Sequence, residues 1–343
     1  MAERLVLTTL DDGRWAHLLE RAPGVTPFHH PAWARLLADC YRFDAVVAGL
    51  VDADGVMTAG LPLVDIRHRA GSRRWVSLPF TDACAPVATD ATTLTTLVRE
   101  LDGARADAGV AHVEVRAALP PPAAPLASGA VIHRRSLPGS VDELWATTHK
   151  SRRTGVRTAR NKGVTVRPAR QRDDLTGHFY DLHVATRRRH GVPVQPKRFF
   201  ELLWDRVVVP GLGVVLVAEV EGAPIAAAVY LEWRGTMVCK FGASDPAHWQ
   251  RRANDLLMWE SFTWAIARDA TEVDFGRSDL ENAGLGQHKR SWGGMEEPLV
   301  YSTIGVAGRD ERGRLAHLAG PVLRHAPLWV TRATGRALYR RAA

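Results

Sequence analysis

Positively charged side chains dominate one short stretch, HKSRRTGVRTARNKGVTVRPARQR at residues 149–172, which holds nine lysines and arginines and no acid. Four of them would share one face of a helix, because they are spaced three or four residues apart: Lys150, Arg153, Arg157 and Arg160. Unpaired like charges at that spacing destabilise a helix by roughly 0.2–0.5 kcal/mol per pair. We therefore expect these side chains to bind phosphate; the alternative, a solvated face, would normally include Glu or Asp. No aromatic residues are interleaved, which favours contact with a phosphate backbone over base stacking.

A second group of candidate residues lies in TEVDFGRSDLENAGLGQHKRSWGG, residues 271–294. The alternating apolar residues of its first part predict a buried strand, and the five glycines that follow predict a flexible loop. This loop would carry Lys289 and Arg290, and its glycines would let the backbone approach a substrate closely. Arg277 and Asp279 directly follow the strand and are expected at the rim of a cleft. The alternative is that Lys289 is an ordinary loop lysine, and Trp292 is expected to be a packing residue.

The overall composition is that of a basic globular protein long enough for two domains, with 343 residues. Its 45 Lys+Arg against 37 Asp+Glu give a net charge of +8, which favours anionic partners such as nucleic acid, nucleotide phosphates or coenzyme A. No apolar run approaches the length of a membrane span, and the N-terminus lacks the apolar core of a signal peptide. Three widely spaced cysteines without a CxxC pair favour a reducing compartment and argue against a zinc site. We expect a cytoplasmic protein with no stable membrane insertion and no metal.

The elements that must position these residues occur twice in the same order. DAVVAGLVDADGVMTAGLPLVDIRH predicts a hairpin, and a third strand, a loop, a helix and the strand HVEVR follow. VVLVAEVEGAPIAAAVYLEWRGTMVCKFGAS starts the second copy, which continues through a loop and a helix to the strand EVDFG. This order is that of the Gcn5-related N-acyltransferase (GNAT) core. The predicted fold class is therefore α/β with mixed sheets of the α+β kind, in two tandem GNAT-like domains.

Proline-rich segments mark the expected domain boundaries. The connector PPPAAPLASGA cannot be helical, and it separates an N-terminal domain at residues 1–138 from a C-terminal domain at residues 139–305. Residues 306–343 form a basic amphipathic tail that prolines interrupt, and we expect it to pack on the first domain.

The start of the second predicted helix is a candidate donor site. In GNAT members that use acyl-CoA, the loop that opens this helix follows the pattern Q/R-x-x-G-x-G/A and cradles a pyrophosphate. Here Gln250-Arg251-Arg252-Ala253-Asn254-Asp255 replaces both glycines and adds a negative charge. Arg251 and Arg252 remain candidates for phosphate contact; the alternative is that Asn254 only caps the helix and the arginines are solvated.

Several motifs together resemble the Fem-type aminoacyltransferases, the FemXAB family. The resemblance rests on ANDLL, which precedes a helix, on DFGRS with the glycine-rich loop after it, and on the K-x-x-W-G motif in KRSWG. PFHHPAWARLL, HKSRRTGVRTARNKGVTV and FYDLHVATRRRHGVPVQPKRFFELLWDRV resemble earlier segments of the family. The resemblance covers the chain from Phe28 to Tyr301 and is most specific in its second half.

The resemblance implies transfer of an aminoacyl group from aminoacyl-tRNA to an amine, on a peptidoglycan precursor, a peptide or a small natural product. This forms an amide or peptide bond, the work of an acyltransferase of the EC 2.3 class. In the family, the lysine that matches Lys289 lies at the reacting carbonyl, where a cation stabilises the oxyanion by about 3 kcal/mol. Asp279 and Asp82 are the other catalytic candidates; Asp82, in SLPFTDACAPV, would accept the amine proton or cap a turn. Aminoacyl-tRNA is a co-substrate, and no cofactor is implied.

The residues expected to bind substrate are Trp33, Arg35, Arg187, Arg277 and Arg290. Bridge-forming members carry a lysine shortly after the tryptophan, whereas this chain has Arg35 after Trp33, which argues against a UDP-muramyl-pentapeptide acceptor. Arg187, with the two arginines after it, is expected to meet an anionic acceptor. Neither the amino acid donated nor the oligomeric state follows from the sequence.

Two other functions fit the same residues. An N-acyltransferase that uses acyl-CoA on the same fold would bind coenzyme A, whereas a tRNA-dependent enzyme would not. A basic RNA-binding module without catalysis would bind tRNA whether or not it is charged. Motifs of other enzyme classes are absent, among them HExxH, GxSxG, the P-loop and a GxGxxG that follows a strand.

Overall fold

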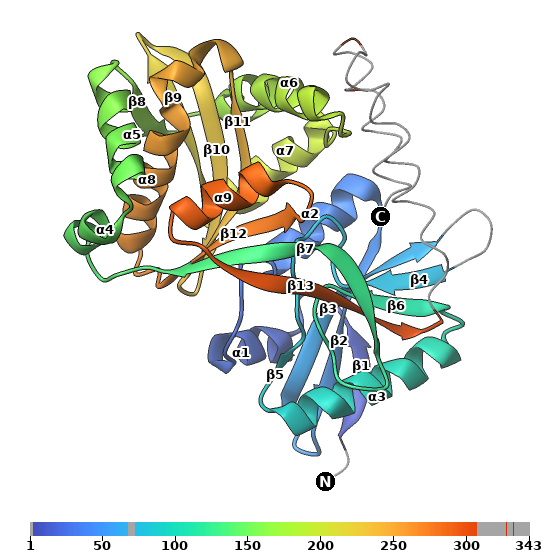
Figure 1. Ribbon diagram of the computed structural model, residues 1–343. Coiled ribbons are helices and arrows are strands. Elements are labelled where there is room, and N and C mark those ends of the chain that lie inside the picture. The colour runs from blue at the N-terminus through green and yellow to red at the C-terminus, as the bar shows by residue number, and fades with distance from the viewer. Residues whose placement is uncertain (1–2, 68–72, 307–326, 328–331, 333–343) are drawn as a thin grey trace. The chain divides into compact units, whose positions relative to one another are not determined.

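The computed structural model describes residues 3–67 and 73–306, together with Pro327 and Arg332. These residues form two compact units, each described below by itself (Figure 1). The first comprises residues 3–130 and 298–306, and the second comprises residues 131–297 with Pro327 and Arg332. Strands β7 (Ala124–Ser136) and β13 (Met295–Gly305) each contribute residues to both units.

The first unit is a mixed sheet with three helices. Its strands lie in the order β1-β2-β3-β4-β6, followed by the C-terminal part of β13, and the short β5 pairs with β3. The pairs β2–β3 and β3–β4 are antiparallel, and β4–β6 is parallel. The elements are β1 (Arg4–Thr8), α1 (Gly13–Arg21), α2 (Pro31–Tyr41), β2 (Asp44–Val51), β3 (Met57–Arg67), β4 (Arg73–Val76), β5 (Val87–Ala88), α3 (Ala91–Asp107) and β6 (His112–Val115).

The second unit repeats this order, with a longer third strand and a longer parallel strand. Its strands follow the order β7-β12-β11-β10-β9-β8, in which β9–β10 and β10–β11 are antiparallel and β11–β12 is parallel. Before the meander come α4 (Val141–Thr147), α5 (Lys150–Asn161), β8 (Thr165–Pro168), α6 (Tyr180–His190) and α7 (Lys197–Leu203), with π-helical turns η1 (Asp174–Phe179) and η2 (Trp204–Val208). The meander and its sequel are β9 (Gly213–Val220), β10 (Ala223–Trp233), β11 (Thr236–Ser244), the 3₁₀ turn η3 (Pro246–Arg251), α8 (Ala253–Ile266), β12 (Glu272–Asp279) and α9 (Ala283–Ser291).

Alternation along the central strands gives the second sheet two apolar faces. Val214, Leu216 and Ala228 share one core cluster with side chains of α5 and α8. On the other face, Phe241 of β11 packs against rings of α7 and η1. Figure 1 shows α5 and α8 side by side on one face of the sheet, with α6 and α7 on the other.

The predicted internal repeat is confirmed, because both units have the same sequence of hairpin, third strand, helix and parallel strand. The turns form as their residues predict: Asp52 accepts hydrogen bonds from Asp54 N and Val56 N, and Gly222 closes the second turn with φ of +79°. Of the predicted tail, only Val306, Pro327 and Arg332 belong to the described residues. Arg332 forms an ion pair with Asp181 of α6, at 2.7 Å, and this contact is within the second unit and not with the first. The expected packing of the rest of residues 306–343 on the first domain lies outside the described residues.

One local prediction is wrong: the glycine-rich segment that carries Lys289 is not a flexible loop. Residues 283–291 form helix α9, which Asn282 caps by accepting a hydrogen bond from Leu285 N at 3.2 Å. Gly293 follows with φ of +83°, a conformation that favours glycine and ends the helix. Trp292 is buried against Phe262, with ring centroids 5.6 Å apart, so the prediction of a packing residue is confirmed.

The part of the chain that the structure describes includes no helix long and apolar enough to cross a bilayer. Within the same residues, no three His, Cys, Asp or Glu side chains are grouped so that they could hold a metal ion.

Candidate functional site

The parallel strands β11 and β12 separate partway along their length. Residues 236–238 pair with residues 272–274 and the pairing stops there, although β11 continues to Ser244 and β12 to Asp279. The β10–β11 register also shifts between Val229 and Tyr230, which leaves Lys240 as an extra residue on β11. A bulge of this kind increases the local twist of a strand. A cavity of the second unit lies at the end of β11 beyond this divergence.

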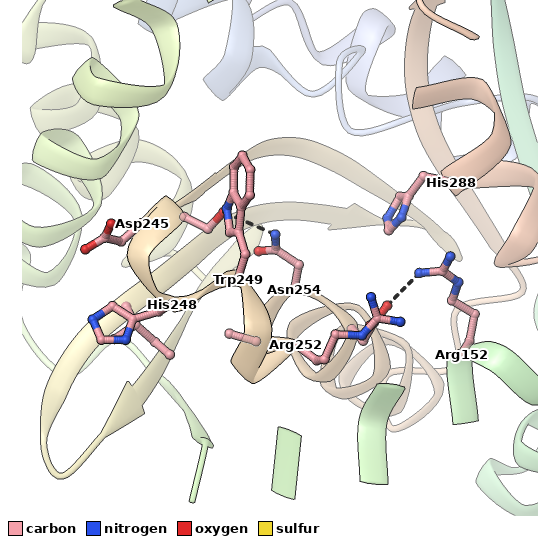
Figure 2. A pocket seen from close by; sticks show the side chains of 11 residues that line it. Arg152, Asp245, His248, Trp249, Arg252, Asn254 and His288 are labelled. Atoms are coloured by element: carbon pink, nitrogen blue, oxygen red, sulfur yellow. Dashed lines mark hydrogen bonds and ion pairs between the residues drawn. The ribbon is translucent and has the colours of Figure 1, made fainter. Parts of the chain in front are cut away.

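The cavity has a volume of about 200 Å³, and its walls come from six elements. Ile225 belongs to β10, Ser244 ends β11, Asp245 is the N-cap of η3 and Trp249 belongs to η3. Arg152 of α5 and His288 of α9 complete the wall, together with the first turn of α8. Figure 2 shows Arg152, Arg252 and His288 gathered at one end, with Asp245 and His248 at the other.

Helix α8 begins at this cavity without a side-chain cap. Its N-cap is Arg252, whose φ of 59° is the left-handed conformation, and no described side chain caps the first turn. The first N–H groups of a helix carry partial positive charge and attract anions. The alternative in which Asn254 caps the helix is wrong, because Asn254 Nδ2 donates to Ser244 Oγ at 3.1 Å. The uncapped end therefore adds positive potential to the cavity wall.

A buried carboxylate balances part of this charge. Asp255, 4% exposed, accepts a hydrogen bond from Arg152 Nη1 at 2.8 Å and lies 3.1 Å from Arg252 Nε. A Cβ atom at Gly155 of α5 would lie 2.3 Å from Asp255 Oδ2, so only glycine lets the two helices approach this closely. Burial and the charge of Arg152 lower the pKa of His288, so this imidazole is neutral at pH 7.

Acids of the same chain neutralise part of the basic stretch at residues 149–172. Arg160 pairs with Glu260 at 3.0 Å, and Arg167 pairs with Asp174 at 2.9 Å and Glu219 at 2.7 Å. Glu260 of α8 and Glu219 of β9 are far from this stretch in the sequence, whereas Asp174 of η1 lies two residues beyond its end. Acids of the chain itself therefore compensate part of the charge that phosphate was expected to compensate.

The four cations predicted to share a helix face do lie on α5, but outside the described lining of the cavity. Lys150 is exposed and Arg153 is partly buried. Arg157 lies over the ring of Trp145 at 5.3 Å from its centroid, and Arg160 is the residue paired with Glu260. Their neighbour Arg152 reaches the cavity instead. Phosphate binding by the four stays a prediction.

The two arginines before α8 lie in different surroundings. Arg251 donates to the carbonyl of Lys162 at 2.9 Å, while Lys162 Nζ donates to the carbonyl of Gln250 at 2.8 Å. This reciprocal pair ties the end of α5 to η3. Arg252 lines the cavity, as expected for a donor-binding residue.

Lys289 lies on α9 and is 6% exposed. Its ammonium group donates to the carbonyls of Gly276 at 2.7 Å and Arg277 at 2.8 Å, at the end of β12. Gly276 has φ of +71°, and its N–H donates to Asp274 Oδ1 at 2.6 Å. The lysine is therefore a rigidly held cation next to the diverging strands.

Cys239 of β11 is the thiol close to this lysine. Burial raises the pKa of the Cys239 thiol, the negative charge of Asp274 raises it further, and Lys289 lowers it in part. The net direction is upward, so the thiol stays protonated at neutral pH. A protonated thiol is a poor nucleophile, which argues against covalent catalysis by Cys239.

The other predicted residues of this segment form ion pairs within it. Arg277 donates to Asp279 Oδ1 through Nε at 2.8 Å and Nη2 at 2.7 Å. Arg290 Nη1 donates to Glu296 Oε2 at 2.6 Å. The structure therefore brings Lys289 next to Arg277 and Asp279 of β12, whereas Arg290 pairs with Glu296 of β13.

Three of the predicted residues lie in the first unit. Trp33 is buried and donates its indole N–H to Thr81 Oγ1 at 2.8 Å, and Arg35 forms an ion pair with Asp11. The backbone carbonyl of Asp82 accepts a hydrogen bond from the Tyr301 hydroxyl at 3.0 Å. Their roles toward an acceptor stay predictions, as does that of Arg187, whose Nε donates to the carbonyl of Pro193 at 2.9 Å in the second unit.

Residues 147–290, which hold the cavity, the diverging strands and Lys289, match the family model of the acetyltransferase (GNAT) domain. The second unit is a GNAT-type acyltransferase domain. The expected enzyme class, a transferase of acyl groups (EC 2.3), is confirmed. No curated protein matches the sequence.

Solved structures share the fold over most of the chain. FemX superimposes with a TM-score of 0.71 at 14% identity, covering 88% of this chain and 97% of FemX. L-PGS from Bacillus licheniformis gives 0.53 at 14% identity and covers 98% of both chains. A tandem GNAT protein from the clavulanic acid biosynthesis pathway gives 0.54 at 12% identity, over 90% of this chain and 100% of that one. The prediction of two tandem GNAT-like domains with a FemXAB-like fold is confirmed.

Sequence reasoning missed Arg152, Trp249, Asp255 and His288 as wall residues of one cavity. They come from α5, η3, α8 and α9, and no motif links the four. One signal was present: Gly155 interrupts the basic helix, and a glycine within a helix often marks a close approach. Asp255 was noted for its charge but not as the partner of Arg152.

Proposed function

We propose that this acyltransferase moves an aminoacyl group from the 3′ ester of aminoacyl-tRNA to an amine and forms an amide. The FemX-like fold and the K-x-x-W-G motif at Lys289 support this donor. Since charged tRNA is made in the cytoplasm, the reaction is placed there. The acceptor is an amine on a peptidoglycan precursor, a peptide or a small natural product.

The observation that carries the choice of donor is the buried Asp255 carboxylate at the start of α8. Among the described residues that line the cavity, Arg152 and Arg252 are balanced by Asp245 and Asp255. A diphosphate, with at least two charges, would meet a carboxylate that already holds both arginines. A phosphodiester carries one charge and meets less repulsion. The balance therefore favours the backbone of an RNA over coenzyme A.

The reaction proposed is aminolysis of an ester. The acceptor nitrogen attacks the ester carbonyl carbon, the C–N bond forms, and the carbonyl electrons move to oxygen as an oxyanion. When this intermediate collapses, the bond to the ribose 3′ oxygen breaks and that oxygen takes the proton lost by the amine. The products are an amide and a tRNA with a free 3′ hydroxyl.

Lys289 is proposed to stabilise the negative charge that develops on the carbonyl or leaving oxygen. The carbonyls of Gly276 and Arg277 fix its ammonium group before any substrate binds. A cation held in place in a buried setting stabilises a transition state more than a mobile, solvated one. Asp279 and Asp82 stay candidates for the proton acceptor.

The second candidate function is N-acyl transfer from acyl-CoA. The GNAT domain match at residues 147–290 and the uncapped start of α8 favour it. It requires the Asp255 carboxylate to move or to become protonated when the diphosphate binds.

The deciding experiment offers both donors to the protein together with an extract of small-molecule amines. Charged tRNAs carry different radiolabelled amino acids, and acetyl-CoA consumption is followed in parallel. Discharge of one tRNA that depends on the extract supports the proposal. Consumption of acetyl-CoA with no tRNA discharged replaces it with the second function.

A further inference from the structure

Trp249 is an exposed tryptophan in the wall of the cavity. It is 51% exposed, and no other tryptophan that the structure describes is exposed to this degree. A large aromatic ring normally lies in a core or contacts a partner, since burial of its surface is favourable. The exposure of this ring therefore indicates contact with a binding partner.

The indole is held in a fixed orientation. Its Nε1–H donates to Ser244 Oγ at 3.0 Å, and Asn254 Nδ2 donates to the same oxygen at 3.1 Å. Ser244 ends β11 and Asn254 lies in the first turn of α8, so two regular elements hold the ring (Figure 2). Because the ring is already ordered, binding a ligand to its surface costs less side-chain conformational entropy than binding to a mobile ring would.

A cation lies against the same ring. The guanidinium carbon of Arg189 is 5.1 Å from the ring centroid of Trp249, within the range of a cation–π contact. Arg189 belongs to the last turn of α6, which is entirely basic: Arg187, Arg188, Arg189 and His190. The sequence shows no aromatic residue interleaved with cations here, because Trp249 comes from η3, about sixty residues later.

An exposed aromatic ring beside arginines is the combination that binds single-stranded nucleic acid. Bases stack on the ring while cations meet the adjacent phosphate. The cavity beside Trp249 leads to the start of α8, where the donor end is proposed to bind. Asn254, next to the ring, adds an amide group able to contact a base edge.

We propose that Trp249, oriented by Ser244 and flanked by Arg189, is the stacking platform for the adenine base at the 3′ end of the donor. This rests on the proposed function, in which that adenine is the terminal base of aminoacyl-tRNA. Coenzyme A also carries an adenine, so the test separates the two sources.

The experiment measures binding of two RNA hairpins by fluorescence anisotropy. One ends in single-stranded CCA, and the other is identical except that its last nucleotide lacks the base. Trp249→Ala weakens the CCA hairpin about tenfold or more. It leaves the abasic hairpin nearly unchanged, because that RNA has no terminal base to stack. Arg189→Ala weakens both hairpins by a smaller factor, through the lost phosphate contact.

Trp264→Ala is the matched control. Trp264 also has an arginine over its ring, with Arg268 4.9 Å from the centroid, but it lies outside the described lining of the cavity. Thermal unfolding confirms that each variant is folded before binding is compared. This control is expected to bind both hairpins like the unmodified protein.

The outcomes separate the platform from the proposed donor. Equal effects of Trp249→Ala on both hairpins, or no effect on either, overturn the platform, whether or not charged tRNA is discharged. Selective loss of coenzyme A binding in Trp249→Ala, with no RNA bound by the unmodified protein, keeps the adenine platform but overturns the tRNA donor. Failure of the unmodified protein to bind either adenine-containing ligand overturns both.

Discussion

The two units contain the same core, but the helix that follows its third strand starts with a side-chain cap in the first unit and without one in the second. In the first unit, Asp90 caps α3 by accepting hydrogen bonds from Thr93 N and Thr93 Oγ1, both at 2.8 Å. In the second, α8 starts at the left-handed Arg252 without a side-chain cap and opens onto a cavity. A capped start is closed to ligands, whereas an uncapped start offers its N–H groups to one. The comparison supports the proposal that the second copy of the fold binds the donor at this position and the first copy does not.

The third strand of the core is short in the first unit and long in the second. β4 has four residues, after which Leu78 and Phe80 adopt φ of 57° and 62° and turn the chain into a buried segment. β11 has nine residues and continues beyond its pairing with β12 to reach the cavity wall. Side chains with positive φ are strained and persist only where the surroundings hold them. The longer strand is what gives the second unit its site.

The largest effect is expected at Lys289. Lys289→Met removes the fixed cation and should lower the single-turnover rate of aminoacyl transfer by about a hundredfold or more, as for loss of an oxyanion-stabilising group. Lys197→Met, at an exposed lysine of α7, is the matched control and should leave the rate unchanged. A rate for Lys289→Met within about threefold of the unmodified protein would show that the cation does not act on the reacting oxygens.

Asp255→Asn tests the charge balance of the second unit. Loss of the carboxylate leaves Arg152 without its charged partner, so the free energy of unfolding should fall by about 3 kcal/mol. With less repulsion, coenzyme A should bind about tenfold more tightly, equal to roughly 1.4 kcal/mol. Denaturant titration and calorimetry measure the two changes. Unchanged or weaker binding of coenzyme A would mean that Asp255 does not select the donor.

Each unit has a buried histidine that should make its free energy of unfolding depend on pH. Burial lowers the pKa of His183 to about 3, whereas an unfolded chain has a value near 6.5. Since the unfolded state binds the proton first, the free energy of unfolding should fall by about 1.4 kcal/mol per pH unit between pH 6.5 and pH 3 on account of this group. His183→Asn should remove that contribution, while His29 of the first unit, whose pKa burial also lowers, keeps its own. Parallel pH profiles for His183→Asn and the unmodified protein would contradict this assignment.

The smallest effect is expected at the capped helix of the first unit. Asp90→Ala removes the cap of α3 and should lower the free energy of unfolding by about 1 kcal/mol. Transfer by the folded enzyme and affinity for coenzyme A should not change. If Asp90→Ala changed the affinity for coenzyme A as much as Asp255→Asn does, the two helix starts would not differ in donor binding.

Much of the fold follows from local patterns, because hairpins with turns such as DADG and EVEG specify their own pairing. Helix α9 does not follow from local patterns, since its glycines disfavour a helix. The Asn282 cap and the burial of Lys289 stabilise it in the structure. The position of Arg252 was predictable from the segment that opens α8. The convergence of Arg152, Trp249 and His288 was not, because it depends on the divergence of β11 from β12 and on the close packing of α5 at Gly155.

Crosslinking tests the central claim most directly, that the second unit holds the donor end at the start of α8. A short RNA hairpin that ends in CCA would carry a photoreactive terminal adenosine, and mass spectrometry would locate the crosslinked peptide. The account predicts crosslinks within residues 244–255, reduced in Trp249→Ala. Crosslinks within residues 77–94 of the first unit, with none at residues 244–255, would contradict it.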